Sequence, residues 1–576
     1  MKKLLCLLLA LVMLLSVCAC AKTQTPATET PEAAAPSAET PAETPEVQPV
    51  VPADDALEEI TLPLCEEKKE LTVWLLWSNE KVTDPNTLET AKYVEELTNV
   101  HINWITVSAA EAAEKYQLML ASSELPDIII PFSQSENPDV AIADGWALDM
   151  ADLIAKYMPN YRKYLAEHPV EASLLSGQDG VVRTFAGIPC DDNGYRGELQ
   201  WCGLCVRSDL IEKAGYDGPL ETIEDYHNML LTCKENLDGL TAPLYVSGTG
   251  YGATGAFMSA YGVASTVMNL DGKVVFGPAQ DGYGQWLEEM RKWYSEGLID
   301  PNFDTVSGLD PYFAPASVVG TNQTVCFTTL YNCIGTLMPM IMGNVADPTA
   351  VITPVMNPVL KSGDTPTIST IGTGSMGIAA TSNYYITTDC DEPELAAQWL
   401  DFLVSEQGMA AANYGKEGVT YELDTAEDAK YRYVLKEGYN TEEDYTTKTS
   451  YMGIGAYNWD TKAQISDAQM AALSAMYAAQ GIVLPDTYQM LVDAKEMWDS
   501  QAQMDLCNFA KLTDEETAAI ATINTDITTR VAEYTVQYIK GLTDKTFDEF
   551  RAELESMQLQ VLIDTYQTAL DRYLSK

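Results

Sequence analysis

The sequence predicts an α/β fold with at least two lobes, and three observations support this prediction. A continuous apolar run at 71–77 is typical of a buried parallel strand, and 101–107 and 127–130 are predicted as the second and third strands. Amphipathic segments at 88–98 and 111–122 lie between these runs and favour helices with one apolar face. Strands and helices therefore alternate, which indicates an open α/β sheet. The part of the 576-residue chain after position 60 is too long for one small core, so a second lobe is expected.

The loops that follow the first and third strands are candidates for ligand contact. In open α/β sheets, ligands bind beyond the carboxyl ends of the strands. Trp77, Ser78 and Asn79 follow the first strand, and Phe132 follows the third. An alternative is that Trp77 packs in the core as Trp74 does, because tryptophan is often buried for packing alone.

The N-terminus has the features of a lipoprotein signal peptide. Lys2 and Lys3 precede an apolar run at 4–15, which is too short to span a bilayer. Ala19 then precedes Cys20, as in a bacterial lipobox, so residues 1–19 are expected to be removed and Cys20 to be acylated. The alternative is ordinary secretion with cleavage near Ala19 or Ala21. The predicted location is the extracellular face of the cell membrane.

Residues 20–69 are expected to form a tether. Positions 21–60 are mostly Ala, Thr, Pro and Glu, a composition that buries too little apolar surface to order the chain. The predicted tether would hold the folded part away from the membrane.

The charge balance excludes some partners. The chain has 34 basic and 84 acidic residues, for a net charge of −50, which argues against nucleic acid and anionic lipid as partners. The sequence has only three His residues and lacks a phosphate-binding loop, so neither a metal ion nor a cofactor is expected.

Of the 12 cysteines, removal of Cys6, Cys18 and Cys20 leaves nine, an odd number. Cys202 and Cys205 have redox-motif spacing but lie in an apolar run, so buried strand thiols are expected.

An ordered series of segments resembles bacterial extracellular solute-binding proteins of family 1, the lipoproteins of carbohydrate ABC importers. The segments are LTVWLLWS, TAKYVEELTNVHINW, YQLMLASSELPDIII, DLIAKYMPNYRKYL, the GIP at 187–189, GLCVRSDLIEKAGYDGPLETIEDYHNML, WYSEGLIDPNF, NYGKEGVTYEL and DEFRAELESMQLQVLIDTYQTALDRYL. They run from about residue 70 to the last helix, and they are most similar to the large Gram-positive branch of the family. No single segment is decisive, whereas the ordered set is specific.

The resemblance implies a two-lobed, periplasmic-binding-protein-like fold of type II with hinge crossings. Crossings are expected near 189–203, 325–333 and 372–380. The first lobe would combine 70–190 with 330–372, and the second would combine 200–325 with 380–576. The glycines at 372, 374 and 377 suit a crossing, because glycine relaxes the restrictions on φ.

Sugar sites combine aromatic faces with polar side chains, which selects further candidates near the crossings and in loops. These candidates are Asp191, Asp192, Tyr195, Trp201, Tyr251, Tyr331, Asn332, Tyr457 and Trp459. Asp191 and Asp192 also fit an ordinary turn, and their spacing does not match a calcium loop. Arg207 is expected to pair with Asp209 or another neighbour, and Asp127 to act as a structural cap or turn residue.

The predicted function is capture of an oligosaccharide or related polar solute, with delivery to the permease subunits of an ABC importer. The chain contains no GxSxG or HExxH motif, so a catalytic function is not expected. A monomer is expected. The alternatives are a binder of peptides or another non-sugar solute, a cell-surface carbohydrate-active enzyme, and a sensing lipoprotein.

Overall fold

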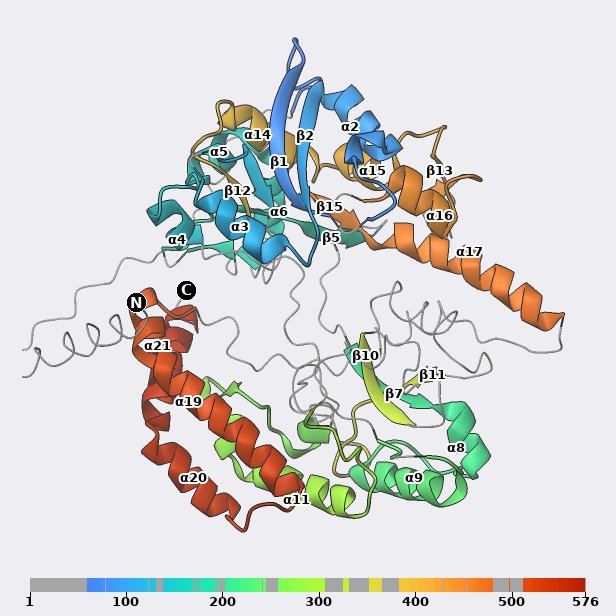
Figure 1. Cartoon of the computed structure of the whole chain (residues 1–576), viewed down its shortest axis with the longest axis vertical. Coiled ribbons are helices and arrows are strands. Elements are labelled where there is room, and N and C mark those ends of the chain that lie inside the picture. Colours follow the sequence, from blue (N-terminus) through green and yellow to red (C-terminus); the bar gives the residue numbers. More distant parts are fainter. Residues whose placement is uncertain are drawn as a thin grey trace, which may run out of the picture. The chain divides into compact units, whose positions relative to one another are not determined.

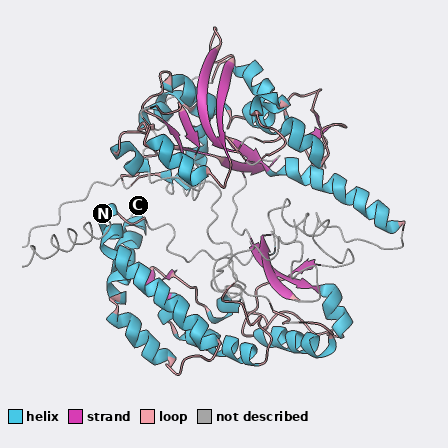
Figure 2. Cartoon of the chain, viewed as in Figure 1, coloured by secondary structure: helices cyan, strands magenta, loops and turns pink. Residues whose placement is uncertain are grey.

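The computed structural model describes most of the chain after residue 59. The described residues are 60–77, 79–122, 124–130, 138–168, 171–172, 175–177, 179–191, 194–195, 202–240, 242–244, 257–305, 325–330, 352–364, 383–427, 429–451, 453–479, 497 and 511–574. Figure 2 colours their helices, strands and loops. The predicted signal peptide, Cys20 and the tether up to residue 59 lie outside these ranges. Of the helices in these ranges, none combines the length and apolar character needed to cross a bilayer.

The first lobe is built on a five-stranded sheet with the strand order β2-β1-β3-β12-β4. Its strands are β1 (Lys69–Leu76), β2 (Val100–Val107), β3 (Ile128–Ile130), β4 (Phe185–Ala186) and β12 (Asn383–Ile386). β2 and β3 both pair with β1 in parallel, whereas β12 is antiparallel to β3 and to β4. Figure 1 shows β1 and β2 side by side. The three predicted strands are thus confirmed, as are helices α2 (Glu89–Thr98) and α3 (Ala112–Leu120).

Both faces of this sheet are covered, which explains why β1 is apolar without interruption. Leu71, Val73 and Leu75 belong to one buried cluster, which also includes Ile128 and Ile130. Trp74 points to a second cluster, which contains Tyr116 of α3. A strand buried on both faces needs apolar residues at successive positions, and not only at alternate ones.

Asp127 joins the start of β3 to β1. Its carboxylate accepts hydrogen bonds from the main-chain N–H of Thr72 (2.6 Å) and from the Thr72 hydroxyl (2.7 Å). The main-chain N–H of Asp127 in turn donates to the Thr72 hydroxyl oxygen (2.9 Å). The predicted structural role of Asp127 is therefore confirmed.

The remaining elements of the first lobe lie between these strands or after β12 in sequence. They are the 3-10 turn Pro85–Thr87, α4 (Pro138–Ala143), α5 (Ala151–Tyr157), α6 (Pro159–Glu167), α14 (Pro393–Phe402), α15 (Glu406–Tyr414), β13 (Tyr421–Leu423), β14 (Tyr433–Leu435), α16 (Glu442–Asp444), the π-helical turn Tyr445–Thr449 and α17 (Trp459–Ala478). A small sheet of β15 (Ala456–Asn458), β5 (Ile188–Asp191) and β6 (Gly194–Tyr195) completes this lobe.

The second lobe has its own sheet and its own core. β7 (Cys202–Arg207) is the central strand and pairs antiparallel with β10 (Cys326–Leu330) and β11 (Ile352–Pro354). The other elements are α8 (Ser208–Ala214), α9 (Ile223–Asn236), the 3-10 turns Ser259–Tyr261 and Gly277–Ala279, β8 (Val267–Leu270), β9 (Lys273–Phe276), α11 (Asp281–Ser295), α19 (Asp514–Ile539), α20 (Phe547–Ser556) and α21 (Leu559–Leu574). One buried cluster joins residues 204–326 to 520–570.

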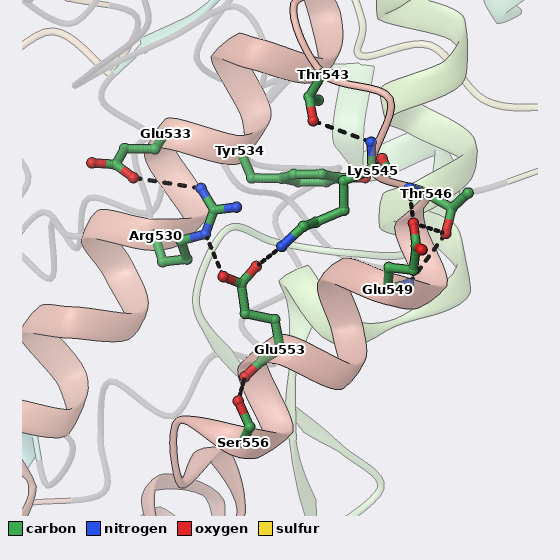
Figure 3. A network of polar contacts seen from close by, with 9 residues as sticks. All are labelled: Arg530, Glu533, Tyr534, Thr543, Lys545, Thr546, Glu549, Glu553 and Ser556. Carbon is green, nitrogen blue, oxygen red and sulfur yellow. Dashed lines mark hydrogen bonds and ion pairs between the residues drawn. The ribbon is translucent and has the colours of Figure 1, made fainter.

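The C-terminal helices begin with paired capping contacts and are joined by ion pairs. Thr513 and Glu516 form a capping box at α19, and Thr546 and Glu549 form one at α20. Glu553 of α20 bridges Arg530 of α19 (3.1 Å) and the Lys545 ammonium (2.7 Å), as Figure 3 shows. These helices pack their apolar faces into the second core.

The strand pairing differs from the predicted division of the chain between lobes. β11 lies in the segment 330–372 assigned to the first lobe, yet it pairs with β7 of the second. β12 and the helices up to α17 lie in the segment assigned to the second lobe, yet β12 pairs with β3 and residues 384–403 belong to the first core. The described residues on either side of 196–201, 365–382 and 480–510 therefore belong to different lobes. The glycines at 372, 374 and 377, predicted to suit a crossing, lie outside the described residues.

The described cysteines behave as buried thiols. Cys190, Cys205, Cys233, Cys326 and Cys390 are buried and Cys65 is partly buried, and the structure pairs none of these six in a disulfide. Burial raises the pKa of the Cys233 and Cys390 thiols to about 12, so both stay protonated at neutral pH. The expected buried strand thiol is confirmed for Cys205.

Candidate functional site

The small β15-β5-β6 sheet brings together four predicted site residues that are far apart in sequence. In the register of this sheet, Tyr457 lies opposite Pro189, and Asp191 lies opposite Gly194. Tyr195 of β6 lies opposite Cys190, and Trp459 begins α17 directly after β15. Asp191 thus lies on β5, Tyr195 on β6 and Tyr457 on β15, and Trp459 is the first residue of α17.

The alternation of β15 decides which side chains are available for contact. Ala456 and Asn458 are buried, whereas Tyr457 between them is partly exposed. The main-chain N–H of Asn458 donates to the Asn413 side-chain oxygen (3.0 Å), and the Asn413 amide donates to the Ala456 carbonyl (2.8 Å). The inward side of β15 is therefore fixed by buried hydrogen bonds, and Tyr457 lies on the opposite side.

Tyr451 packs against Tyr457 and was not among the predicted residues. The two ring centroids are 4.9 Å apart, with an interplanar angle of 46°. Part of Tyr451 is exposed. Removal of its phenol group from water raises the pKa of that group well above the usual range, so the hydroxyl stays protonated and can donate a hydrogen bond. It donates to the Gly455 carbonyl (3.3 Å). The available sequence signal was a pair of tyrosines that flank two glycines, Gly453 and Gly455.

The loop after β1 is attached to the turn that precedes Tyr451. The Asn79 side-chain amide donates to the Thr446 carbonyl (2.6 Å), and the Asn79 side-chain oxygen accepts from the Lys81 N–H (3.1 Å). The hydroxyl of Tyr445 accepts a hydrogen bond from the main-chain N–H of Tyr451 (3.2 Å). Asn79 therefore has partners within the protein on both its donor and its acceptor groups.

Trp77 lies at the predicted place but is partly buried against the first lobe. Its indole N–H donates to the Val82 carbonyl (2.6 Å). Its ring packs on the small cluster of Val82, Leu88 and Ala91. These contacts favour a packing role for the indole and leave part of the ring exposed.

Asp191 ends β5 and pairs with Gly194, the first residue of β6. Asp192 lies outside the described residues, so its turn interpretation stays a prediction. Seven predicted site residues lie outside the described residues, namely Ser78, Phe132, Asp192, Trp201, Tyr251, Tyr331 and Asn332.

Other polar candidates are engaged in structural contacts. The Arg207 guanidinium is buried and forms a bidentate pair with Asp209, at 2.8 Å and 2.6 Å, as the salt-bridge interpretation predicted. His101 contacts Glu95 (2.7 Å), and His227 contacts Glu296 (2.6 Å) and stacks on Trp293. Within the described ranges, no group of three or more His, Cys, Asp or Glu residues is placed to hold a metal ion.

Comparison with known proteins matches this architecture along most of the chain. A family model described as "Bacterial extracellular solute-binding protein" matches residues 84–410. The fructooligosaccharide ABC transporter substrate-binding protein FusA of Streptococcus pneumoniae serotype 4 is 25% identical over 551 residues, which cover 90% of this chain and 93% of FusA.

Solved structures have the same fold at lower sequence identity. An extracellular solute-binding protein from Bifidobacterium longum subsp. infantis has a TM-score of 0.66 and 16% identity, and the match covers 88% of this chain and 98% of that one. FusA of S. pneumoniae in complex with kestose has a TM-score of 0.62 and 22% identity, with 88% and 99% of the two chains covered. The predicted two-lobed α/β fold class is thus confirmed.

The family model covers more than half of the chain, and the solved structures agree with it in fold. This chain belongs to the bacterial extracellular solute-binding protein family.

Proposed function

We propose that this chain is a lipid-anchored extracellular protein that captures an oligosaccharide or related polar solute between its lobes and delivers it to an ABC importer. The observation that carries this proposal is the similarity to FusA along 90% of the chain. The partly exposed Tyr451–Tyr457 pair adds local support, because sugar sites include aromatic rings, and Asp191 and Trp459 lie at nearby backbone positions of the same small sheet and the helix after it. Capture would shift the protein toward a closed state through contacts to both lobes.

The decisive experiment is thermal melting of the mature chain, residues 20–576 with Cys20 replaced by Ala, against a panel of ligands. The panel contains kestose and other oligosaccharides, monosaccharides and short peptides. A ligand at 100 times its dissociation constant should add about 2.7 kcal/mol to the free energy of unfolding and raise the melting temperature by several degrees. A shift with oligosaccharides and no hydrolysis of the ligand supports the proposal. A shift with peptides alone, or turnover of a glycan, would contradict it.

Membrane attachment through Cys20 is part of the proposal and has its own test. Cells that express the full chain are fed an alkyne fatty acid, and labelled protein is detected after coupling to a fluorophore. Label on the natural chain and none on Cys20→Ala supports lipidation. Release of unlabelled natural protein into the medium would instead support ordinary secretion.

A binding function is favoured over catalysis because FusA, the relative matched along 90% of this chain, is a transporter substrate-binding protein. A monomer in solution and association with permease subunits complete the proposal. Light scattering of the purified mature chain and co-purification with its permease would check them.

A further inference from the structure

Among ring pairs within the described residues, Tyr451 and Tyr457 form the one pair whose two members are both partly exposed. In the other pairs at least one ring is buried, as in Tyr414 with Tyr433 or Trp104 with Trp399. Aromatic pairs that serve only packing are expected to remove at least one of the two rings from water. The exposure of this pair therefore calls for a separate explanation.

Tyr451 and the described residues that follow it, 453–455, are held in place at several points. The hydroxyl of Tyr384 donates to the Gly453 carbonyl (2.9 Å), and the main-chain N–H of Ile188 donates to the Gly455 carbonyl (3.0 Å). Gly453 and Gly455 both have a φ of +80°, a conformation that L side chains rarely adopt. Together with the Tyr445 hydroxyl that accepts from the Tyr451 N–H, these contacts fix the ring of Tyr451 beside β15.

The hydrogen bonds of Tyr451 also determine what it can offer a ligand. Its hydroxyl is used in the contact to Gly455. The ring itself is then the part that remains for an external contact, beside Tyr457 and the partly exposed Pro189 that lies opposite Tyr457. A rigid, partly exposed aromatic surface loses little conformational freedom when a ligand covers it, so it favours binding.

We propose that Tyr451 and Tyr457 form an aromatic wall that stacks on the apolar face of one sugar ring of the ligand, with residues 453–455 as its positioning segment. This inference rests on the proposed function and deepens it. The C–H groups on one face of a pyranose or furanose ring match an aromatic surface, whereas its hydroxyl groups need polar partners.

The test compares ring removal with hydroxyl removal in the mature chain, using isothermal titration with kestose or the best oligosaccharide of the melting panel. Tyr451→Ala and Tyr457→Ala should each weaken the affinity about tenfold or more, because each loses a stacking surface. Tyr451→Phe should stay within about threefold of the natural protein, because it keeps the ring. Tyr457→Leu keeps apolar volume without a flat ring and should resemble Tyr457→Ala, which guards against loss through unfolding.

The matched control is Tyr157→Ala, which removes a partly exposed tyrosine of α5 whose hydroxyl donates to Glu394 (2.7 Å). This variant should bind as the natural chain does. Natural affinity in Tyr451→Ala and in both Tyr457 variants would overturn the aromatic wall while leaving carbohydrate binding intact. Absence of oligosaccharide binding by the natural chain would overturn both the wall and the proposed function.

Discussion

The side chain of Asn79 donates a hydrogen bond to the main-chain carbonyl of Thr446, 2.6 Å away and 367 positions later in the sequence. This contact joins the loop after the first strand to the π-helical turn Tyr445–Thr449. The neighbouring residue Tyr445 in turn supports Tyr451 through its hydroxyl. The loop after β1, which the sequence nominated as a ligand loop, is thereby connected to the aromatic pair at β15.

Replacement of Asn79 by Ala should destabilise the protein and affect binding only indirectly. Loss of the hydrogen bond to Thr446 should cost about 1 kcal/mol in the free energy of unfolding. Denaturant titration measures this loss, and titration with an oligosaccharide measures affinity. Asn103→Ala, which removes an exposed amide on β2, is the control and should change neither quantity. A large loss of affinity without loss of stability would instead indicate direct ligand contact by Asn79.

Replacement of Trp77 distinguishes packing from ligand contact. Because the ring packs on Val82, Leu88 and Ala91, Trp77→Ala should lower the free energy of unfolding by about 1–3 kcal/mol. Trp77→Phe keeps much of the packing and loses the indole hydrogen bond to Val82, so it should cost less. Weakened ligand binding at unchanged stability in Trp77→Ala would support the alternative, a ligand-contacting indole.

Asp401 should make stability depend on pH. Its buried carboxyl accepts hydrogen bonds from the N–H groups of Asn160 (3.2 Å) and Tyr161 (2.7 Å) at the start of α6. Burial raises its pKa from 3.8 to about 6, against the opposing effect of these hydrogen bonds. The folded state then holds a proton between about pH 4 and 6 that the unfolded state has lost, so this contribution to stability falls as pH rises through that window.

The measurement is the free energy of unfolding of the natural chain minus that of Asp401→Asn, taken at several values between pH 4 and 7. This difference isolates Asp401 from the many other acidic groups. It should fall by roughly 1–3 kcal/mol as pH rises. A difference that increases with pH would mean that the hydrogen bonds to the carboxylate outweigh burial and that its pKa is lowered.

Local patterns of apolar residues predicted the elements that are buried on both faces or on one face along their whole length. β1 is covered on both faces, so it has an unbroken apolar run, and α2 has one apolar face. The lobe assignments of β11 and β12 could not be predicted in the same way. Each is only three or four residues long, and its place depends on pairing with a strand more than 140 residues earlier. Such short segments carry too little periodicity to indicate their partners.

Prediction of the candidate site from the sequence was limited in the same way, because the position of its residues depends on distant parts of the chain. Tyr457 was nominated because it lies in an aromatic, polar segment, and the structure places it on the outer side of β15. Tyr451 was missed because its position depends on the left-handed conformation of Gly453 and Gly455, which the sequence permits but does not require. Asn79 was nominated from its place after a strand, whereas its partner Thr446 belongs to a distant turn.

The two glycines beside Tyr451 provide a matched pair that separates backbone strain from steric clash. Both have a φ of +80°, but a Cβ atom at Gly453 would meet no atom within 4 Å, whereas one at Gly455 would lie 2.4 Å from the Leu403 Cβ. Gly453→Ala should therefore cost about 1–2 kcal/mol from the left-handed conformation alone. Gly455→Ala carries the same strain plus overlap with a buried residue of the first core, so the loss of unfolding free energy should exceed that of Gly453→Ala by about 1–3 kcal/mol. Denaturant titration of both variants gives the comparison. Equal losses would mean that the segment shifts away from Leu403 at little cost, and would contradict the rigid positioning on which the aromatic wall depends.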